Sequence, residues 1–300
     1  LLTNKILTFK YMISLYFLFF AILIPRVITY NIIDGTTSNK NNLYIPKSIL
    51  NLVGRDDFIP TSDTDSICYK PPIPGTWEKK PPMITISPGG IYGFYTLGTC
   101  AYIKENYNLT DYLYSGASAG SWNSLYMVLK NDYNFSKGIL DIDTDNISSI
   151  FELEYAIKNS ILNLYSTKDF DLTRVFIGVT VFKKKKLKTS IYSDFEDLKD
   201  AIDCCIASSH IPFVTGGAIK RYKDILSFDG GFSKYPYIRN VEPVLHIEPS
   251  MWNKNKKVGC SESHLFNFKK NRHLITDLFN RGYNDALKNK EFLDKIFNTV

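Results

Sequence analysis

The 300-residue sequence has few of the residues that build disulfide frameworks and metal centres. It contains 5 cysteines and 4 histidines, and no two cysteines have the CxxC spacing of a metal site. Cys204 and Cys205 are adjacent, but they fall in an expected helix, where neighbouring side chains point in different directions. We therefore expect neither a disulfide framework nor a metal site.

Charge is neither high nor concentrated. The formal net charge is +6 and, apart from one lysine cluster at residues 183–186, the basic residues are spread along the chain. A nucleic-acid-binding protein more often has a basic stripe with interleaved aromatics. The composition, 44% hydrophobic and 22% charged, argues against disorder and against a protein with many membrane spans. We expect no nucleic-acid partner and only a weak attraction to anionic membrane surfaces.

One long apolar run extends from Tyr11 to Ile24, with Lys5 and Lys10 before it. Its length fits the hydrophobic part of a secretory signal better than the roughly 20 residues of a bilayer span. No clean cleavage site follows, so a retained anchor and a buried core helix stay open as alternatives. Residues 1–33 are expected to be a signal sequence or an N-terminal membrane anchor, which implies the secretory pathway or a membrane-associated location.

Residues 34–82 are polar and proline-rich and end in KPPIPGTWEKKPP. This composition indicates an extension or linker. We see no internal repeat. A chain of this length is long enough for one large α/β domain, and residues 83–300 are expected to be that catalytic domain, including helices at its C-terminal end.

The domain begins with a short apolar run, Met83 to Ser87, which predicts a buried strand. The glycine-rich segment PGGIYG follows, and the apolar spacing of Phe94 to Glu105 predicts a helix. A glycine turn between a strand and a helix aims free backbone N–H groups at whatever occupies it. The turn fits neither GxGxxG nor a P-loop. A phosphate, an oxyanion and no ligand at all remain open at this point.

A second strand, turn and helix carry the pattern G-x-S-x-G. Tyr112 to Ser115 predicts the end of a strand, the segment GASAG follows, and a helix is expected through about Leu129. This is the context of a nucleophile elbow, in which a strained turn presents the serine and the glycines let strand and helix approach. Ser118 is therefore the predicted nucleophile, and the dipole of the following helix favours negative charge beside it.

The hydroxyl of Ser118 needs a base to take its proton. Asp229 ends an apolar strand, residues 225–228, and two glycines follow it, which would place its carboxylate in a turn at the rim of the sheet. An Asp-Gly turn without catalytic role is the simpler interpretation of this segment alone. A Ser, Asp, His order, as in α/β-hydrolases, is the rival mechanism. Its candidate histidines are His246, His264 and His273.

Four segments in this order resemble the patatin-like phospholipase family: SPGGIYGFYTLG, SGASAG, ASSHIPF and SFDGG. The resemblance covers about Met83 to Tyr237, and the glycine turn is most similar to the adipose triglyceride lipase branch. It implies a three-layer α/β/α fold with a central, mostly parallel sheet. It also implies a Ser-Asp dyad, here Ser118 and Asp229, without a histidine, because His210 falls at a variable position of its segment.

The resemblance further implies that no metal and no cofactor takes part. It also implies an oxyanion hole, whose expected donors are Gly89, Gly90, Gly93 and, by elbow geometry, Ala119. Two positions depart from the family. Pro88 stands where many members have a glycine, and it has no N–H to donate. Tyr92 stands where plant and bacterial members often have arginine, which weakens the expectation that phospholipids are preferred over neutral acylglycerols.

Later segments predict further elements of the sheet. Residues 175–182 and 187–192 predict two strands, joined by Lys183 to Lys186 as a solvated hairpin tip or, alternatively, a membrane contact. Residues 194–205 predict a helix with Asp194 as its cap, and residues 241–248 predict another strand.

Three hypotheses about function follow from these patterns. The first is a lipid acyl hydrolase that cleaves carboxylic esters of phospholipids or acylglycerols at a membrane or lipid-droplet surface, through an acylated Ser118. The second is an esterase with a Ser-His-Asp triad. The third is a non-catalytic storage or lipid-binding descendant, against which the intact Ser118 and Asp229 argue.

Overall fold

The computed structural model describes residues 81–131, 135–140, 142, 147, 149–183, 186–239, 241–252 and 274–298. The chain divides into two units, residues 1–60 and 61–300, and all the described residues belong to the second. The predicted signal or anchor at 1–33 and almost all of the predicted linker at 34–82 lie outside the described residues. Within the described ranges, no helix has both the length and the apolar character needed to cross a bilayer.

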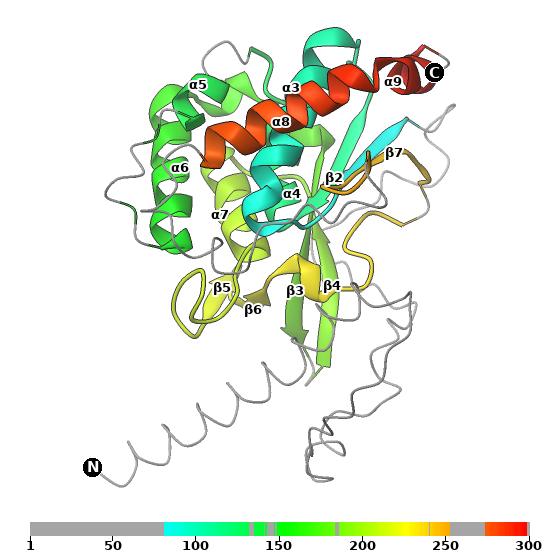
Figure 1. Ribbon diagram of the computed structural model, residues 1–300. Coiled ribbons are helices and arrows are strands. Elements are labelled where there is room, and N and C mark those ends of the chain that lie inside the picture. The colour runs from blue at the N-terminus through cyan, green and yellow to red at the C-terminus, as the bar shows by residue number, and fades with distance from the viewer. Residues whose placement is uncertain are drawn as a thin grey trace, which may run out of the picture. The chain divides into compact units, whose positions relative to one another are not determined.

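A 7-stranded sheet forms the centre of the domain, with the order β5-β6-β3-β2-β1-β7 and β4 paired with β3 (Figure 1). The strands β7, β1, β2 and β3 are parallel, whereas β4 and β6 run antiparallel to β3 and β5 runs antiparallel to β6. The expected α/β class with a central, mostly parallel sheet is confirmed. The strands are β1 (Met83–Ile86), β2 (Leu113–Ala117), β3 (Val175–Lys183), β4 (Lys186–Tyr192), β5 (Lys220–Tyr222), β6 (Ile225–Phe228) and β7 (Pro243–Ile247).

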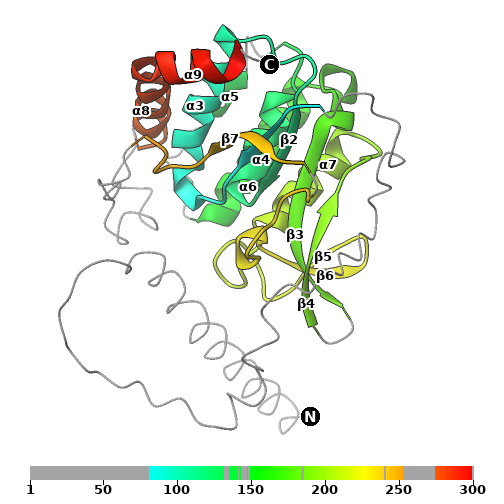
Figure 2. The ribbon, with the colours of Figure 1, turned by 90° about the vertical axis from the view of Figure 1, so that its right-hand side faces the viewer.

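Helices flank this sheet, and in Figure 2 the strands face the viewer while α4, α6 and α7 lie behind them. The α-helices are α3 (Gly93–Asn106), α4 (Ala119–Met127), α5 (Phe135–Leu140), α6 (Ile150–Leu164), α7 (Leu198–Ser208), α8 (Leu274–Lys288) and α9 (Lys290–Phe297). Short 3-10 helices are η1 (Gly90–Tyr92), η2 (Thr167–Asp169), η3 (Leu172–Arg174) and η4 (Gly230–Phe232). The parallel strands are connected through helices, as parallel pairing requires.

The core follows from the alternation of side chains along each strand. Ile84, Tyr114 and Ile177 point to the helical face and pack with residues such as Leu125 and Ala201. Their neighbours in sequence point to the other face, because successive side chains of a strand alternate. That face holds a smaller cluster, which contains Met83, Leu113, Phe176, Ile191 and Ile238.

The two C-terminal helices belong to this domain through α8. A Cβ at Gly98 of α3 would collide with the backbone at Phe279 of α8, and a Cβ at Gly282 of α8 would collide with the carbonyl of Tyr95. The two glycines therefore let the helices approach closely. The hydroxyl of Tyr95 also donates a hydrogen bond to Asp285 Oδ2 at 2.9 Å.

The strands and helices predicted from the sequence form at the expected places, with one correction at the start of α7. Asp194 does not cap this helix. Asp197 does, because its side chain accepts a hydrogen bond from the N–H of Asp200 at 2.7 Å. An N-cap side chain reaches only the N–H groups two or three residues ahead, and the helix begins four residues after Asp194. Asp194 instead has a positive φ of 54° in the preceding loop.

Candidate active site

Ser118 lies in a strained turn between β2 and α4. Its φ of 53° and ψ of −129° are unfavourable for a residue with a side chain, and it is the N-cap of α4. Glycine is required on either side of Ser118 because a side chain would collide with the neighbouring backbone. A Cβ at Gly116 would collide with the carbonyl of Gly120, and a Cβ at Gly120 would collide with the carbonyl of Ile86. The G-x-S-x-G segment thus folds as the elbow that its sequence predicts.

Asp229 is hydrogen-bonded to this serine. The Oγ of Ser118 donates to Oδ2 of Asp229 at 2.7 Å, although 111 residues separate them. The sheet explains the encounter: Ala117 pairs with Gly178 of β3, and Phe228 pairs with Thr180 of the same strand. Ser118 and Asp229 directly follow these two paired residues. Because β2 runs parallel to β3 and β6 runs antiparallel to it, the two residues approach the same level of β3 from its two sides.

The carboxylate of Asp229 is held in a fixed orientation. Its Oδ1 accepts a hydrogen bond from the N–H of Gly231 at 2.6 Å, and its own N–H donates to the carbonyl of His210 at 2.7 Å. Only Oδ2 is then left for Ser118. Oδ2 is thus positioned to accept the serine proton.

Burial changes the basicity of Asp229. The side chain is 5% exposed, and this desolvation raises its pKa to about 6, while the hydrogen bonds from Ser118 and Gly231 act in the opposite direction. A carboxyl group with this pKa is still ionised at neutral pH. Its basicity approaches that of a free imidazole, whose pKa is about 6.5, so a histidine is not needed to supply a base of that strength.

The four predicted oxyanion donors occupy different positions. Gly90 has a positive φ of 53° and lines the same cavity as Ser118 and Ala119. Ala119 is the first residue of α4, so its N–H has no partner inside the helix. Gly89 precedes Gly90, and its carbonyl accepts the N–H of Tyr92.

Gly93 differs from the other three, because its N–H donates to the carbonyls of Gly90 and Ile91. That bond directs the N–H into the turn rather than toward Ser118. A Cβ at Gly93 would lie 2.6 Å from the Cβ of Ala119. The geometry therefore explains Gly93 by the close approach of α3 to α4.

Ser208 contacts the backbone of Ser118, which was not predicted from the sequence. The N–H of Ser118 donates to Ser208 Oγ at 2.8 Å, and this hydroxyl donates to the carbonyl of Gly178 at 2.7 Å. The strained backbone of the elbow is thereby tied to β3. Ser208 lies in the ASSHIPF segment, whose resemblance to the family indicated a position near the site. No pattern in the sequence indicated its hydrogen bond to Ser118.

The side chains of the two histidines that the structure describes form no hydrogen bond with Ser118 or Asp229, although the backbone carbonyl of His210 accepts the N–H of Asp229. His246 lies on β7, where its Nδ1 is 2.8 Å from Oγ1 of Thr85. His210 is 3% exposed, its Nε2 has no hydrogen-bond partner, and burial lowers its pKa to about 4. The other two candidates of the triad, His264 and His273, lie outside the described residues.

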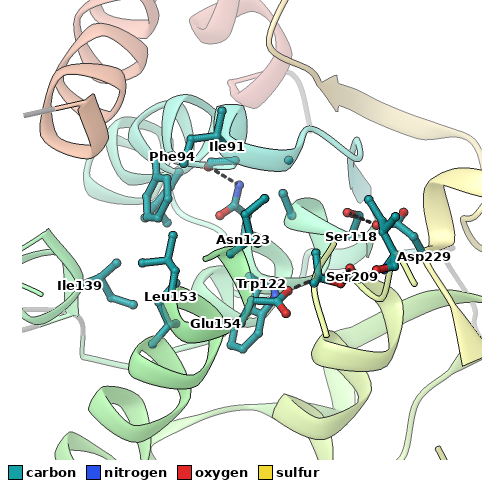
Figure 3. Close-up of a pocket in the computed structure, with 18 of the residues that line it drawn as sticks. Ile91, Phe94, Ser118, Trp122, Asn123, Ile139, Leu153, Glu154, Ser209 and Asp229 are labelled. Atoms are coloured by element: carbon teal, nitrogen blue, oxygen red, sulfur yellow. Dashed lines mark hydrogen bonds between the residues drawn. The ribbon is translucent and has the colours of Figure 1, made fainter. Parts of the chain in front are cut away.

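A cavity of about 130 Å³ opens beside Ser118, and its wall is mainly apolar. In Figure 3 the Ser118 and Asp229 pair lies at one side of this cavity, and Phe94, Leu153 and Ile139 lie at the other. The wall comes from η1, α3, α4, α5, α6 and the segment after α7. Its apolar members are Ile91, Phe94, Leu97, Trp122, Phe135, Ile139, Ile150, Leu153, Ile157, Ile161 and Ile211.

One acidic side chain interrupts this apolar wall. Glu154 of α6 lines the cavity and is 8% exposed, and its Oε2 has no hydrogen-bond partner. Burial is the main cause that raises its pKa well above the usual value, and the charge of Asp229 adds to it. Neither α6 nor Glu154 was predicted from the sequence.

Among the residues that the structure describes, no three or more His, Cys, Asp or Glu side chains form a group that could hold a metal ion. Cys100, Cys204 and Cys205 are buried and free. Burial raises the pKa of the Cys205 thiol to about 12, so it is not a reactive thiolate.

Similarity to known proteins is found only among solved structures. No family model matches the chain, and no curated protein matches it. Among solved structures, the chain is similar to VipD from Legionella pneumophila, with a TM-score of 0.42 and 12% sequence identity over 72% of this chain and 67% of that one.

Proposed function

We propose that this protein is a patatin-like serine hydrolase that cleaves the carboxylic esters of lipids. One observation carries the proposal: a serine at a strained elbow donates a 2.7 Å hydrogen bond to a buried carboxylate whose other oxygen is already bound. Serine hydrolases in general place a base within hydrogen-bond reach of the nucleophile, and a third group orients that base. The motifs that resemble the patatin-like family contribute both residues.

Acylation begins with the hydrogen bond from Ser118 to Asp229. As Oγ forms a bond to the ester carbon, its proton passes to Oδ2 of Asp229. The carbonyl oxygen becomes an oxyanion, which the N–H groups of Gly90 and Ala119 and the N-terminus of α4 stabilise. The bond to the alcohol oxygen then breaks, and that oxygen takes the proton from Asp229. The products are the free alcohol and an acyl group on Ser118.

Deacylation repeats these steps with water. Asp229, again ionised, accepts a proton from the attacking water, and the hydroxide oxygen forms a bond to the acyl carbon. The second oxyanion is held by the same donors. When it collapses, Ser118 Oγ leaves and recovers the proton from Asp229, and the fatty acid is released.

The cavity supports a lipid acyl chain as the bound group. Its wall is built from aliphatic and aromatic side chains of several helices, and Ser118 lies at one side of it. A chain of methylene groups gains about 0.8 kcal/mol for each CH₂ that leaves water. Tyr92 in place of the family arginine provides no cation for a phosphate headgroup, so acylglycerols are proposed beside phospholipids.

Exposed apolar residues on two elements that also line the cavity, α6 and the segment after α7, support contact with a lipid surface. Phe151 and Tyr155 lie one turn apart on α6 and are 51% and 58% exposed, and Phe213 and Ile219 after α7 are 48% and 68% exposed. Large exposed apolar side chains that gather near a pocket are typical of binding surfaces. A membrane or lipid-droplet surface is the proposed partner, in agreement with the proposed signal or anchor at 1–33 and a secretory or membrane-associated location.

The proposal is tested by labelling and by hydrolysis. The purified full chain and Ser118→Ala are treated with a fluorophosphonate probe and then assayed on phospholipids, triacylglycerols and lysolipids. We expect labelling at Ser118 and hydrolysis by the wild type alone. An unlabelled, inactive but lipid-binding wild type would instead support the storage or lipid-binding alternative.

The triad alternative needs its own variants. His246, His264 and His273 are each changed to glutamine, and the activity on the best ester is compared with that of the wild type. The Ser-Asp mechanism requires activity to survive all three changes. Loss of activity in one variant that still folds would identify the histidine of a triad.

A further inference from the structure

Glu154 occupies a position where an apolar residue would be expected. Along α6, residues Ile150, Leu153, Ile157 and Ile161 form the apolar stripe that lines the cavity, and Glu154 lies on that stripe, one turn after Ile150. Side chains three and four residues apart share one face of a helix. The carboxyl group therefore faces the cavity rather than solvent, in agreement with its 8% exposure.

The polar groups around Glu154 leave part of its carboxyl unused. Ser209 is a hydrogen-bonding neighbour of this carboxyl, and its hydroxyl also accepts a hydrogen bond from Trp122 Nε1 at 3.1 Å and donates to the carbonyl of Cys205 at 3.0 Å. Oε2 of Glu154 has no hydrogen-bond partner. A buried polar atom without a partner destabilises the folded protein, because it has lost its hydrogen bonds to water.

Burial shifts the acid–base equilibrium of this carboxyl group. Burial and the nearby charge of Asp229 raise its pKa well above the ordinary value, whereas a hydrogen bond with Ser209 and the charge of Lys220 act in the opposite direction. A protonated carboxyl both donates and accepts hydrogen bonds. A purely hydrocarbon chain offers it no partner at all, because CH₂ groups form no such bonds.

We propose that Glu154 is a specificity-determining residue that selects acyl chains carrying a hydroxyl or oxo group along their length. The inference rests on the proposed function, since it places the acyl chain in this cavity. Its basis is geometric: a polar group more than nine-tenths buried, inside an apolar wall, with one oxygen lacking a partner. A site built to hydrogen-bond a substituent rejects a ligand without it more strongly than an apolar site rejects an extra group.

A competition assay measures this selection directly. The substrates are methylumbelliferyl octadecanoate and its monohydroxy isomers, which together place the hydroxyl at successive carbons. Equal amounts of the plain ester and one isomer are mixed, and the ratio of released fatty acids gives the ratio of kcat/KM. We expect a preference of about tenfold for a hydroxyl within one narrow range of carbons.

Variants of α6 assign the preference to Glu154. In Glu154→Leu the hydroxylated ester is expected to react more slowly and the plain ester faster, so that the preference disappears. Glu154→Gln keeps a donor and an acceptor and is expected to retain most of the preference. Glu152→Leu makes the same chemical change at an exposed position of the same helix, and its preference should equal that of the wild type.

The outcomes separate this inference from the proposed function. Cleavage of the plain ester by the wild type, but not by Ser118→Ala, supports the hydrolase proposal. If every hydroxyl position then gives a kcat/KM ratio near one, the hydrolase proposal stands and the selection by Glu154 is wrong. Failure of the wild type to cleave any ester overturns both. A preference that persists in Glu154→Leu also overturns the role of Glu154. If Glu154→Leu does not fold, the kcat/KM ratios of the wild type decide whether hydroxylated chains are selected.

Discussion

Two buried carboxyl groups line the same cavity, and their surroundings differ. Asp229 has hydrogen-bond partners on both oxygens, from Gly231 and Ser118, whereas Oε2 of Glu154 has none. Burial raises the pKa of both, to about 6 for Asp229 and well above the usual range for Glu154. Hydrogen bonds from Ser118 and Gly231 lower the pKa of Asp229, whereas at Glu154 the charge of Asp229 adds to the effect of burial and only Ser209 is a hydrogen-bonding neighbour that lowers the pKa. Two similarly buried carboxyl groups thus have different electrostatic surroundings, and we propose different roles for them.

The two carboxyl groups are also proposed to have different roles in this cavity. Asp229 follows β6, and a backbone hydrogen bond to His210 holds it in place, which suits a group that must meet Ser118 at a set distance. Glu154 stands on a helix that forms the wall. Proton transfer needs the first arrangement, and recognition of a chain along its length needs the second.

The largest expected effect is loss of activity at the dyad. Ser118→Ala and Asp229→Asn should each lower kcat on a lipid ester by about 10⁴-fold, because one removes the nucleophile and the other removes the base. Activity is measured on the lipid panel, with thermal melting to check the fold. Should Asp229→Asn retain more than a tenth of the activity, Asp229 is not the base.

The pH dependence should follow Asp229. The base must be ionised, so kcat/KM is expected to fall as the pH drops through about 6 and to decline by about tenfold for each further pH unit. A soluble short-chain ester, assayed between pH 4 and pH 9, avoids changes in the lipid surface. A midpoint near pH 4 would mean that Asp229 is not shifted by burial as proposed.

Stability should change at the same residue in the opposite direction to activity. A carboxyl whose pKa is raised on folding contributes stability that is complete below its unfolded pKa and is lost as the pH rises through about 6. Asp229→Asn removes this loss, so at pH 8 the variant should be more stable by about 2–3 kcal/mol and at pH 4 nearly equal to the wild type. Denaturant unfolding at the two pH values measures the difference.

A smaller effect is expected at Ser208. Ser208→Ala removes the acceptor for the N–H of Ser118 at the strained elbow, and we expect kcat to fall by about tenfold with a loss of about 1–3 kcal/mol in stability. Ser190→Ala is a matched control, since Ser190 is 1% exposed and its Oγ has no hydrogen-bond partner. Equal losses in both variants would show that general packing, not the elbow, is responsible.

The smallest effect is expected at His246. Its side chain bonds Thr85 on β1, so His246→Gln, which can keep that bond, should change activity on the same ester by less than about twofold. A loss of about 100-fold or more in a folded variant would add a histidine to the base and remove the contrast between two carboxyl groups.

Sequence alone predicted the local parts of this protein well. A strand, a glycine-bounded serine and a helix follow each other within a few residues, so the elbow at Ser118 and the turn at Asp229 could be located from short patterns. The strands of the sheet other than β5, and the hairpin of β3 and β4, followed from apolar runs and their turns. The cap of α7 was placed three residues too early, since two aspartates near the helix start fit the pattern equally well.

Only the tertiary structure decided which distant groups meet. The register of β2 and β6 on β3 places Ser118 beside Asp229, and the end of α7 brings Ser208 into hydrogen-bond contact with Ser118. Glu154 in the apolar wall and the bonded N–H of Gly93 are further results of packing. The physical reason is that a side chain's burial, partners and pKa depend on elements brought in from elsewhere in the chain, whereas turns and helix starts depend on a few neighbouring residues.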